Sequence, residues 1–382
     1  MEAGLQSPAF KQLWETAQSL GNPEIQKWKE SGKKVAGYYC SAMPEELIAA
    51  AGMLPFRIRG TGSQGTDLAD AFFSTINCTF SRHSFNQALR GEFDFLDAFV
   101  MLNSCDNVRR IYDHWIRQFE TPFTHFLSLP KKAEQAQVEF FRQELALLKG
   151  HLEEHLGREI SPDDIREAIR LNNETRRLLR QLYELRKSDA PPITGADTLA
   201  IVVASTAMPK ARFNELLTEV LDELHSAEGI TDYRARLMLV GGIVDDPGYV
   251  NVIEDQGGLV VTDSICFGSR NFWVDVDESD ADPLMALASY YVRDRPSCPR
   301  TFGLHEKRAD YIRDMIDQFH IDGIIFQRLT FCDVWGFEQF PLTNDLKAWD
   351  FPYLMMDREY MLSAVGQLRT RVQAFLETLG GR

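Results

Sequence analysis

Six cysteines are the residues of this chain best suited to redox or metal chemistry. Cys105 shows why, because it follows the apolar run 98–102, which predicts a strand, and Asp106 begins a predicted helix. The end of such a strand usually faces a functional crevice, and a helix N-terminus stabilises a thiolate. Packing, nucleophilic, disulfide and metal-binding roles are all open for this residue. The cysteines are Cys40, Cys78, Cys105, Cys266, Cys298 and Cys332.

The positions of the cysteines favour a shared role over separate packing roles. A single cysteine is most often a core residue. However, Cys266 and Cys332 also lie just beyond predicted strands, where loops and ligands are found. Cys40 follows a further predicted strand, and Cys78 lies at a predicted helix start. Thiolates at such places are suited to soft metals and iron–sulfur clusters.

The spacing of the cysteines excludes the common short metal motifs. The sequence has no CxxC pair, so zinc-ribbon and thioredoxin-like sites are absent, and it has no CxxCxxC ferredoxin run. In a reducing compartment these residues are thiols or metal ligands more often than disulfides. Cys298 lies in 296-PSCPR-300, with no strand end or helix start beside it, so we expect it not to bind a metal.

Composition narrows the class of protein. The chain has 382 residues, is 44% hydrophobic and carries a net charge of −15. The acidic balance argues against nucleic acids and anionic membranes as partners. No run approaches the ~20 apolar residues of a membrane span, and residues 1–20 lack the pattern of a signal peptide. We therefore expect a globular, cytoplasmic protein.

Predicted strands and helices alternate along most of the chain, which indicates an α/β protein with parallel sheets. A long, charged, helical stretch interrupts this pattern, and the Pro- and Gly-containing segment 188–197 then predicts a linker. We predict two Rossmann-like or flavodoxin-like domains separated by a helical insert. The predicted parts are an N-terminal helical segment (1–33), a first α/β domain (34–130), the insert (131–190) and a second α/β domain (191–382).

Nucleotide-binding motifs are weak in this sequence. The segment 60-GTGSQG-65 matches G-x-G-x-x-G between a predicted strand and a helix-like run. The acidic residue expected about 20 residues later is missing, so a dinucleotide site is the less favoured interpretation. There is no G-x-x-x-x-G-K-[ST] motif, and we expect that this chain does not hydrolyse ATP itself.

Longer segments carry a resemblance to a known family. The sequence resembles the catalytic subunits of the benzoyl-CoA reductase / 2-hydroxyacyl-CoA dehydratase family. It is most similar to the smaller of the two non-ATP-binding subunits of ATP-dependent benzoyl-CoA reductase. The matching pieces occur in family order and span nearly the whole chain. They are 37-GYYCSAMPEELIAAAGMLP-55, residues 78–115, residues 238–273 and 323-GIIFQRLTFCDVWGFEQF-340.

The resemblance implies a role for the cysteines. In this family three cysteines hold one [4Fe-4S] cluster per subunit, and they match Cys78, Cys105 and Cys332 here. The cluster is then expected in the cleft between the two α/β domains, with a fourth iron site open to a non-protein ligand. Cys40 and Cys266 also fall in the matching segments and are possible neighbours or alternative ligands.

The resemblance also implies the chemistry and the partners. It implies ATP-dependent, ferredoxin-driven reduction of benzoyl-CoA to cyclohexa-1,5-diene-1-carbonyl-CoA. The implied partners are a homologous sister subunit and an ATP-hydrolysing iron–sulfur activator. Two alternatives remain: a 2-hydroxyacyl-CoA dehydratase subunit that uses a recycled electron, and an electron-relay subunit whose sister chain binds the acyl-CoA. Ser41, Glu45 and Glu46 are candidate substrate or proton-transfer residues, with helix capping as the alternative.

Overall fold

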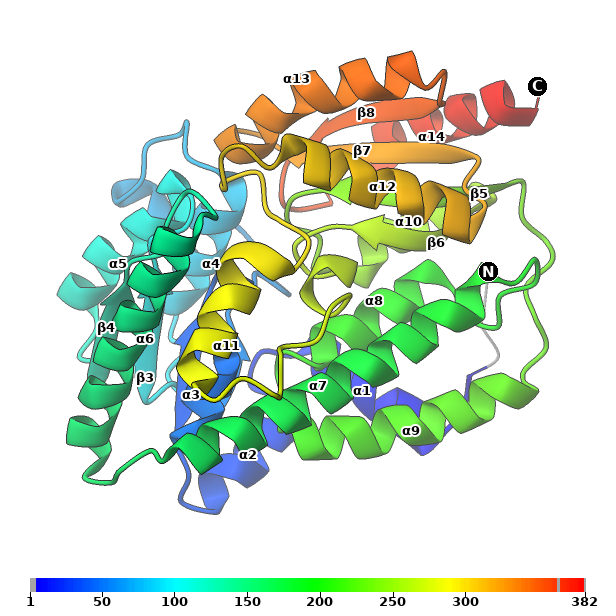
Figure 1. Ribbon diagram of the computed structural model, residues 1–382. Helices are drawn as coiled ribbons and strands as arrows, with labels where there is room; N and C mark the ends of the chain where they lie inside the picture. The colour runs from blue at the N-terminus through cyan, green and yellow to red at the C-terminus, as the bar shows by residue number, and fades with distance from the viewer. Residues whose placement is uncertain (1–4, 363–364, 381–382) are drawn as a thin grey trace.

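The strands of the first sheet are short apolar runs near the N-terminus. The computed structural model describes residues 5–362 and 365–380, and in it four parallel strands lie in the order β2-β1-β3-β4 (Figure 1). Three of the four strands are buried along their whole length, as expected for a parallel sheet that is covered on both faces. The strands are β1 (Val35–Tyr38), β2 (Leu54–Arg57), β3 (Ala98–Leu102) and β4 (Phe123–Leu127).

A second parallel sheet of four strands follows later in the chain, in the order β6-β5-β7-β8. We call the part of the protein built around the first sheet its first half and the part built around this sheet its second half. Its two first strands are seven residues long and fully buried. Two parallel-sheet units are therefore confirmed, and each has the strand order of the first four strands of a flavodoxin-like sheet. The strands are β5 (Ala235–Gly241), β6 (Gly258–Ser264), β7 (Gly323–Leu329) and β8 (Tyr353–Arg358).

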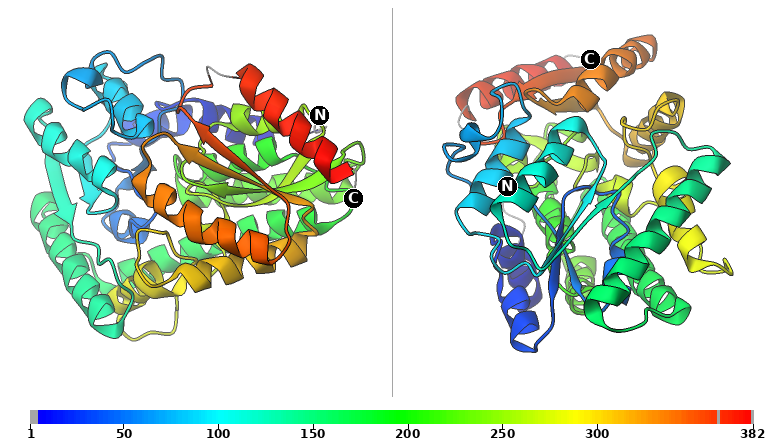
Figure 2. Two further views of the ribbon diagram at one scale, coloured as in Figure 1. Left: turned by 90° about the horizontal axis from the view of Figure 1, so that it is seen from above. Right: turned by 90° about the vertical axis from the view of Figure 1, so that its left-hand side faces the viewer.

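Helices cover both sheets, and the views in Figure 2 show the two sheets on different sides of the molecule with helices between and around them. Within residues 5–362 and 365–380, no helix has both the length and the apolar sequence needed to cross a membrane. The shorter helices that precede two long helices in the chain are α1 (Pro8–Gln18), α2 (Pro23–Glu30), α3 (Glu45–Ala50), α4 (Thr79–Leu89) and α5 (Asp106–Gln118). Those that follow the long helices are α8 (Gly195–Ala204), α9 (Lys210–Ser226), α10 (Pro247–Glu254), α11 (Pro283–Ser289), α12 (His305–Phe319), α13 (Asp333–Ala348) and α14 (Val365–Gly380).

The two long helices of the expected insert contribute to the cores of both halves. Helix α6 (Gln135–Leu156) packs on β4 and on α11. Helix α7 (Pro162–Glu184) begins with a capping box formed by Ser161 and Asp164. Ile165 near its start belongs to the core of the first sheet, whereas Leu182 near its end belongs to the core of the second. Helix α7 therefore connects the two halves of the protein.

Several local predictions differ from the structure. Strand β4 was not predicted, because its FTHFL sequence is partly polar and its middle residues are only partly buried. The predicted linker 188–197 runs into α8, whose residues are all buried except Asp197. The predicted N-terminal helical segment 1–33 contains two helices, because Asn22 caps a new helix that begins at Pro23. Residues 1–4 of this segment, and residues 363–364 and 381–382 of the predicted second α/β domain, lie outside the described residues.

Candidate functional site

All six cysteines line one cavity between the two halves of the protein. Its volume is about 680 Å³, including the space at its open mouth. The structure therefore brings together the three predicted ligands and the two predicted neighbours, and it adds Cys298. The walls also include apolar side chains from both halves, among them Phe80, Val108 and Leu329. We call this space the thiol cavity.

The two sheets converge on the thiol cavity through the carboxyl ends of their strands. In the first sheet, whose strands are all parallel, the order in which strands are added reverses between β1 and β3, and the segments after these strands carry Cys40 and Cys105. In the second sheet the reversal lies between β5 and β7, and the segments after these strands carry Gly242 and Cys332. All four residues line the cavity. Ligands of open α/β sheets bind at such reversal points.

Cys78, Cys105 and Cys332 share one local structure, since each is the N-cap residue of a helix, α4, α5 and α13 respectively. Burial raises the pKa of all three thiols, to about 11 for Cys78. Backbone N–H groups of the first helical turn act in the opposite direction but do not offset the burial. This environment therefore favours the protonated form of the thiols, and a metal that binds them would have to displace their protons.

Cys298 reaches the thiol cavity although its loop has no regular structure. The loop after the π-helix Tyr290–Asp294 is attached to the first half of the protein at two points. Arg295 donates to the backbone oxygen of Ser41, and Arg300 donates to Leu129 O at 3.0 Å. These anchors lie more than 100 residues away in the sequence, so the local sequence around Cys298 contains no signal for its placement.

Three buried arginines surround the thiol cavity without a carboxylate partner in the described part of the chain. Arg57 donates to the carbonyl oxygen of Cys266 at 2.8 Å, and Arg270 donates to the sulfur of the same cysteine at 3.5 Å. Arg300 bonds only to backbone oxygens. Burial lowers the pKa of Arg57 and Arg300. A buried cation without a counterion is costly, so these residues fit a cavity whose contents carry negative charge.

Unpartnered polar atoms are concentrated at the same cavity. Polar groups buried without a hydrogen bond are rare and indicate an absent ligand, strain or a functional role. Among the residues lining the thiol cavity, four such atoms are Tyr39 OH, Ser104 Oγ, Arg300 Nε and Trp335 Nε1. Each carries a hydrogen that can bond to a cofactor sulfur, and such bonds tune reduction potentials.

The thiols are not arranged around one point. Within residues 5–362 and 365–380, no three His, Cys, Asp or Glu side chains are grouped closely enough to bind a single metal ion. An iron–sulfur cluster makes a different demand, because each thiolate binds a different iron atom. The donor set, the arginines and the unpartnered donors of the cavity therefore fit a sulfur-ligated cluster better than a mononuclear metal.

Asn107 connects the three helix starts that carry Cys78, Cys105 and Cys332. Its Oδ1 accepts from the backbone N–H of Cys78 at 3.0 Å. Its Nδ2 donates to Asp333 Oδ1 at 3.2 Å, next to Cys332, and Asn107 itself lies two residues after Cys105. Sequence reasoning missed this residue, because an asparagine in a first helical turn gives no sign of partners in distant segments.

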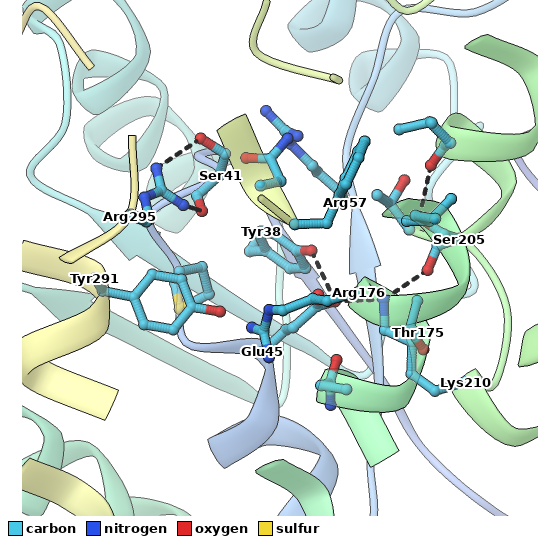
Figure 3. A pocket seen from close by; sticks show the side chains of 17 residues that line it. Tyr38, Ser41, Glu45, Arg57, Thr175, Arg176, Ser205, Lys210, Tyr291 and Arg295 are labelled. Carbon is cyan, nitrogen blue, oxygen red and sulfur yellow. Dashed lines mark hydrogen bonds and ion pairs between the residues drawn. The ribbon is translucent and has the colours of Figure 1, made fainter. Parts of the chain in front are cut away.

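Two of the three other candidate residues border a second cavity of about 530 Å³, including the space at its open mouth, which is shown in Figure 3. We call it the polar cavity. Ser41 and Glu45 line it, and Glu45 pairs with Lys210 at 3.1 Å. Glu46 does not line it. It is fully buried in an ion pair with Arg176 and accepts a hydrogen bond from Tyr291 at 2.8 Å, so it joins α3 to its neighbours.

The segment 60-GTGSQG-65 does not precede a helix that could bind a pyrophosphate. It follows β2, an edge strand, and the next regular element is the 3₁₀ turn Ala69–Ala71. The N–H of Gly60 is bonded to Asp245 Oδ2 at 3.2 Å. The arrangement of a dinucleotide site, with a helix N-terminus after a central strand, is therefore not formed here.

Comparisons with known proteins define the class. The family model described as "2-hydroxyglutaryl-CoA dehydratase, D-component" matches residues 40–379, and the chain belongs to this family. It is 28% identical to "Putative dehydratase subunit YjiM" of Escherichia coli (97% of this chain, 98% of the relative). It is 26% identical to the (R)-2-hydroxyglutaryl-CoA dehydratase subunit beta of Acidaminococcus fermentans (93% and 95%). It is 24% identical to a benzoyl-CoA reductase subunit of Thauera aromatica (92% and 93%).

These relatives place the chain among enzyme subunits related to both CoA-thioester dehydratases and a CoA-thioester reductase. The resemblance inferred from the sequence is thereby confirmed at the level of the family. Identities between 23% and 28% do not separate the reductase from the dehydratases.

Proposed function

We propose that the thiol cavity binds an iron–sulfur cofactor and that this chain is a redox subunit acting in CoA-thioester chemistry. One observation carries the proposal: all six cysteines of the chain line a single cavity whose neighbouring arginines have no carboxylate partner among the described residues. Thiolates on iron–sulfur centres supply the negative charge that these arginines would balance. Bound there, such a cofactor accepts and donates single electrons at low potential.

Cys78, Cys105 and Cys332 are the proposed ligands of a [4Fe-4S] cluster. Each has a helix N-terminus beside it, and Asn107 holds the three helix starts together. Cys40, Cys266 and Cys298 form a second set of three thiols in the same cavity. Burial raises the pKa of Cys266, and the charges of Cys298 and Cys40, which line the same cavity, raise it further. The second set offers ligands for the open side of the cluster or for a second cluster.

The proposed reaction is the ATP-dependent reduction of benzoyl-CoA. Two electrons and two protons added to the ring give cyclohexa-1,5-diene-1-carbonyl-CoA. The relative that is named as a benzoyl-CoA reductase subunit supports this choice. In this reaction the chain would exclude water from the thiol cavity with residues such as Phe80 and Leu329, and would hold its charge with Arg57 and Arg300.

The proposed partners follow from what the chain lacks. Without a G-x-x-x-x-G-K-[ST] motif, the chain needs a separate ATP-hydrolysing iron–sulfur activator, with ferredoxin as the electron donor. The relatives are named as subunits, which supports a homologous sister subunit as a further partner. We propose that the complex is cytoplasmic.

A dehydratase role is the alternative, and it is supported by relatives named (R)-2-hydroxyglutaryl-CoA, (R)-phenyllactyl-CoA and lactoyl-CoA dehydratase subunits. In that role one electron would be recycled after each elimination of water instead of being consumed. In a third arrangement this chain would relay electrons while the sister chain binds the acyl-CoA. Anaerobic assays of the purified complex with ATP, a low-potential donor and either benzoyl-CoA or 2-hydroxyacyl-CoA distinguish these roles.

Iron analysis tests the cofactor directly. Anaerobically purified protein is expected to contain about four irons per chain if only the first set of thiols binds a cluster, and about eight if the second set binds one as well. Cys105→Ala should remove the cluster of the first set. If both sets of thiols bind a cluster, Cys298→Ser should leave about four irons per chain. If only the first set binds one, Cys298→Ser should not alter the iron count. Full iron retention in Cys105→Ala and Cys332→Ser would refute the ligand assignment.

A further inference from the structure

The polar cavity contains more positive than negative charge. Four cationic side chains line it, and two of them are neutralised: Lys210 by Glu45 and Arg176 by the adjoining Glu46. The other two, Arg57 and Arg295, have no carboxylate partner in the described residues.

The two unpaired guanidinium groups lie at the same end of the cavity. Arg295 donates to both the backbone oxygen and the hydroxyl of Ser41, the latter at 3.2 Å. Figure 3 shows Ser41 between Arg295 and Arg57. Burial lowers the pKa of Arg57, and both Arg57 and Arg295 line the cavity together with Ser41. Both side chains are at least 95% buried. Two buried like charges without a counterion indicate a site for an anion.

The remaining walls limit the kind of anion. The buried apolar side chains Met43, Leu179, Val202 and Phe272 line the same space. An organic acid with a short apolar or aromatic body therefore matches the cavity better than a fully hydrated inorganic ion. Guanidinium groups bind carboxylates through paired hydrogen bonds. The other two cations of the cavity, Lys210 and Arg176, are already paired with carboxylates, so a second carboxylate on the ligand would find no unpaired cation there.

We propose that the polar cavity is a binding site for a small monocarboxylate, held at its carboxylate by Arg295, Arg57 and the hydroxyl of Ser41. The site adjoins the thiol cavity, because Ser41 and Arg57 line both spaces. A ligand in the polar cavity therefore lies beside the proposed cofactor. The binding itself does not depend on the proposed redox function, because it can be measured separately from iron content.

Isothermal titration calorimetry on the anaerobically purified full-length chain tests the site with benzoate, butyrate, succinate and inorganic phosphate. Benzoate or butyrate should bind, whereas succinate and phosphate should bind at least about tenfold more weakly. Arg295→Met should weaken benzoate binding by about tenfold or more, because a charge-assisted hydrogen bond is lost. Iron bound by Cys78, Cys105 and Cys332 should be retained in this variant, because Arg295 anchors the loop of Cys298 but does not line the thiol cavity.

Arg236→Met is the matched control. Arg236 is as deeply buried as Arg295 and its side chain bonds only to backbone oxygens, but it lines neither cavity. Its replacement should leave benzoate affinity unchanged. If Arg295→Met does not fold, Ser41→Ala should still weaken binding by about fivefold. The proposal is wrong if neither monocarboxylate binds, if phosphate binds equally well, or if Arg236→Met weakens binding as much as Arg295→Met.

Discussion

The side chains of Asn107 and Asp333 are joined by a hydrogen bond of 3.2 Å between the first turns of α5 and α13. One of these helices starts in the first half of the protein and the other in the second. Asn107 also accepts from the N–H of Cys78. The amide therefore fixes the mutual positions of three thiols and contributes none of its own.

Replacing Asn107 should weaken iron binding without removing a ligand. Asn107→Asp loses the donor and places a carboxylate next to Asp333, so it should be more harmful than Asn107→Ala. Partners that orient metal ligands typically contribute about 10- to 100-fold to metal affinity, and we expect a loss of that size for Asn107→Asp. Competition with an iron chelator and the electron paramagnetic resonance spectrum of the reduced protein measure it. Asn251→Ala, on the exposed surface of α10, is the control and should match the wild type.

The buried pair of Glu46 and Arg176 should be important for stability. Glu46→Ala leaves the guanidinium of Arg176 buried without its carboxylate, and such a change typically costs about 3–5 kcal/mol. The double variant Glu46→Ala/Arg176→Met should lose less than the sum of the two single variants. Urea denaturation of the three variants provides the free energies of unfolding. Additive losses would show that the two residues are not coupled.

Protonation of His305 should make stability depend on pH. Its two ring nitrogens lie 2.9 Å from Glu338 and 2.7 Å from Asp345, which joins α12 to α13. Burial alone would lower the pKa of His305, but the hydrogen bonds and charges of the two carboxylates outweigh it and raise the pKa. A raised pKa in the folded state stabilises the protein below the ordinary histidine value, and this stabilisation is lost as the pH rises through the folded value.

The free-energy difference between the wild type and His305→Gln should therefore be largest near pH 5.5 and smallest near pH 9. Because the ring is partly exposed, we expect about 1 kcal/mol at the acidic end. Urea midpoints measured across this pH range test the sign. His225→Gln, on an exposed part of α9, should show no such trend. A difference that grows with rising pH would contradict the assignment.

The sequence was sufficient for much of the fold because the central strands are continuous apolar runs. The predicted strand 98–102 is β3, with the same bounds. Cys105 and Cys332 were correctly placed beyond strand ends for the same reason. Strand β4 lacked this signal, since its Thr124 and His125 are only partly buried at an edge of the sheet.

The parts of the site that could not be predicted depend on contacts between distant segments. Cys298 was expected to be unsuited to metal binding from its local sequence alone, yet two arginines of its loop attach that loop to the first half of the protein. Glu45 and Glu46 are adjacent in the sequence and equally acidic. Only the tertiary packing separates them into a residue that borders the polar cavity and one buried in an ion pair.

The helix starts joined by Asn107 have a consequence for assembly. Asn107 and Phe331, which it contacts through a hydrogen bond of 3.3 Å, are 224 residues apart in the sequence. A cofactor held by thiols beside both residues would act as a covalent cross-link that closes the chain segment between them into a loop. Closing a long loop restricts the unfolded chain. Newly synthesised protein would thus be protease-sensitive until it is metallated, and iron supply would control how much of it accumulates in the cell.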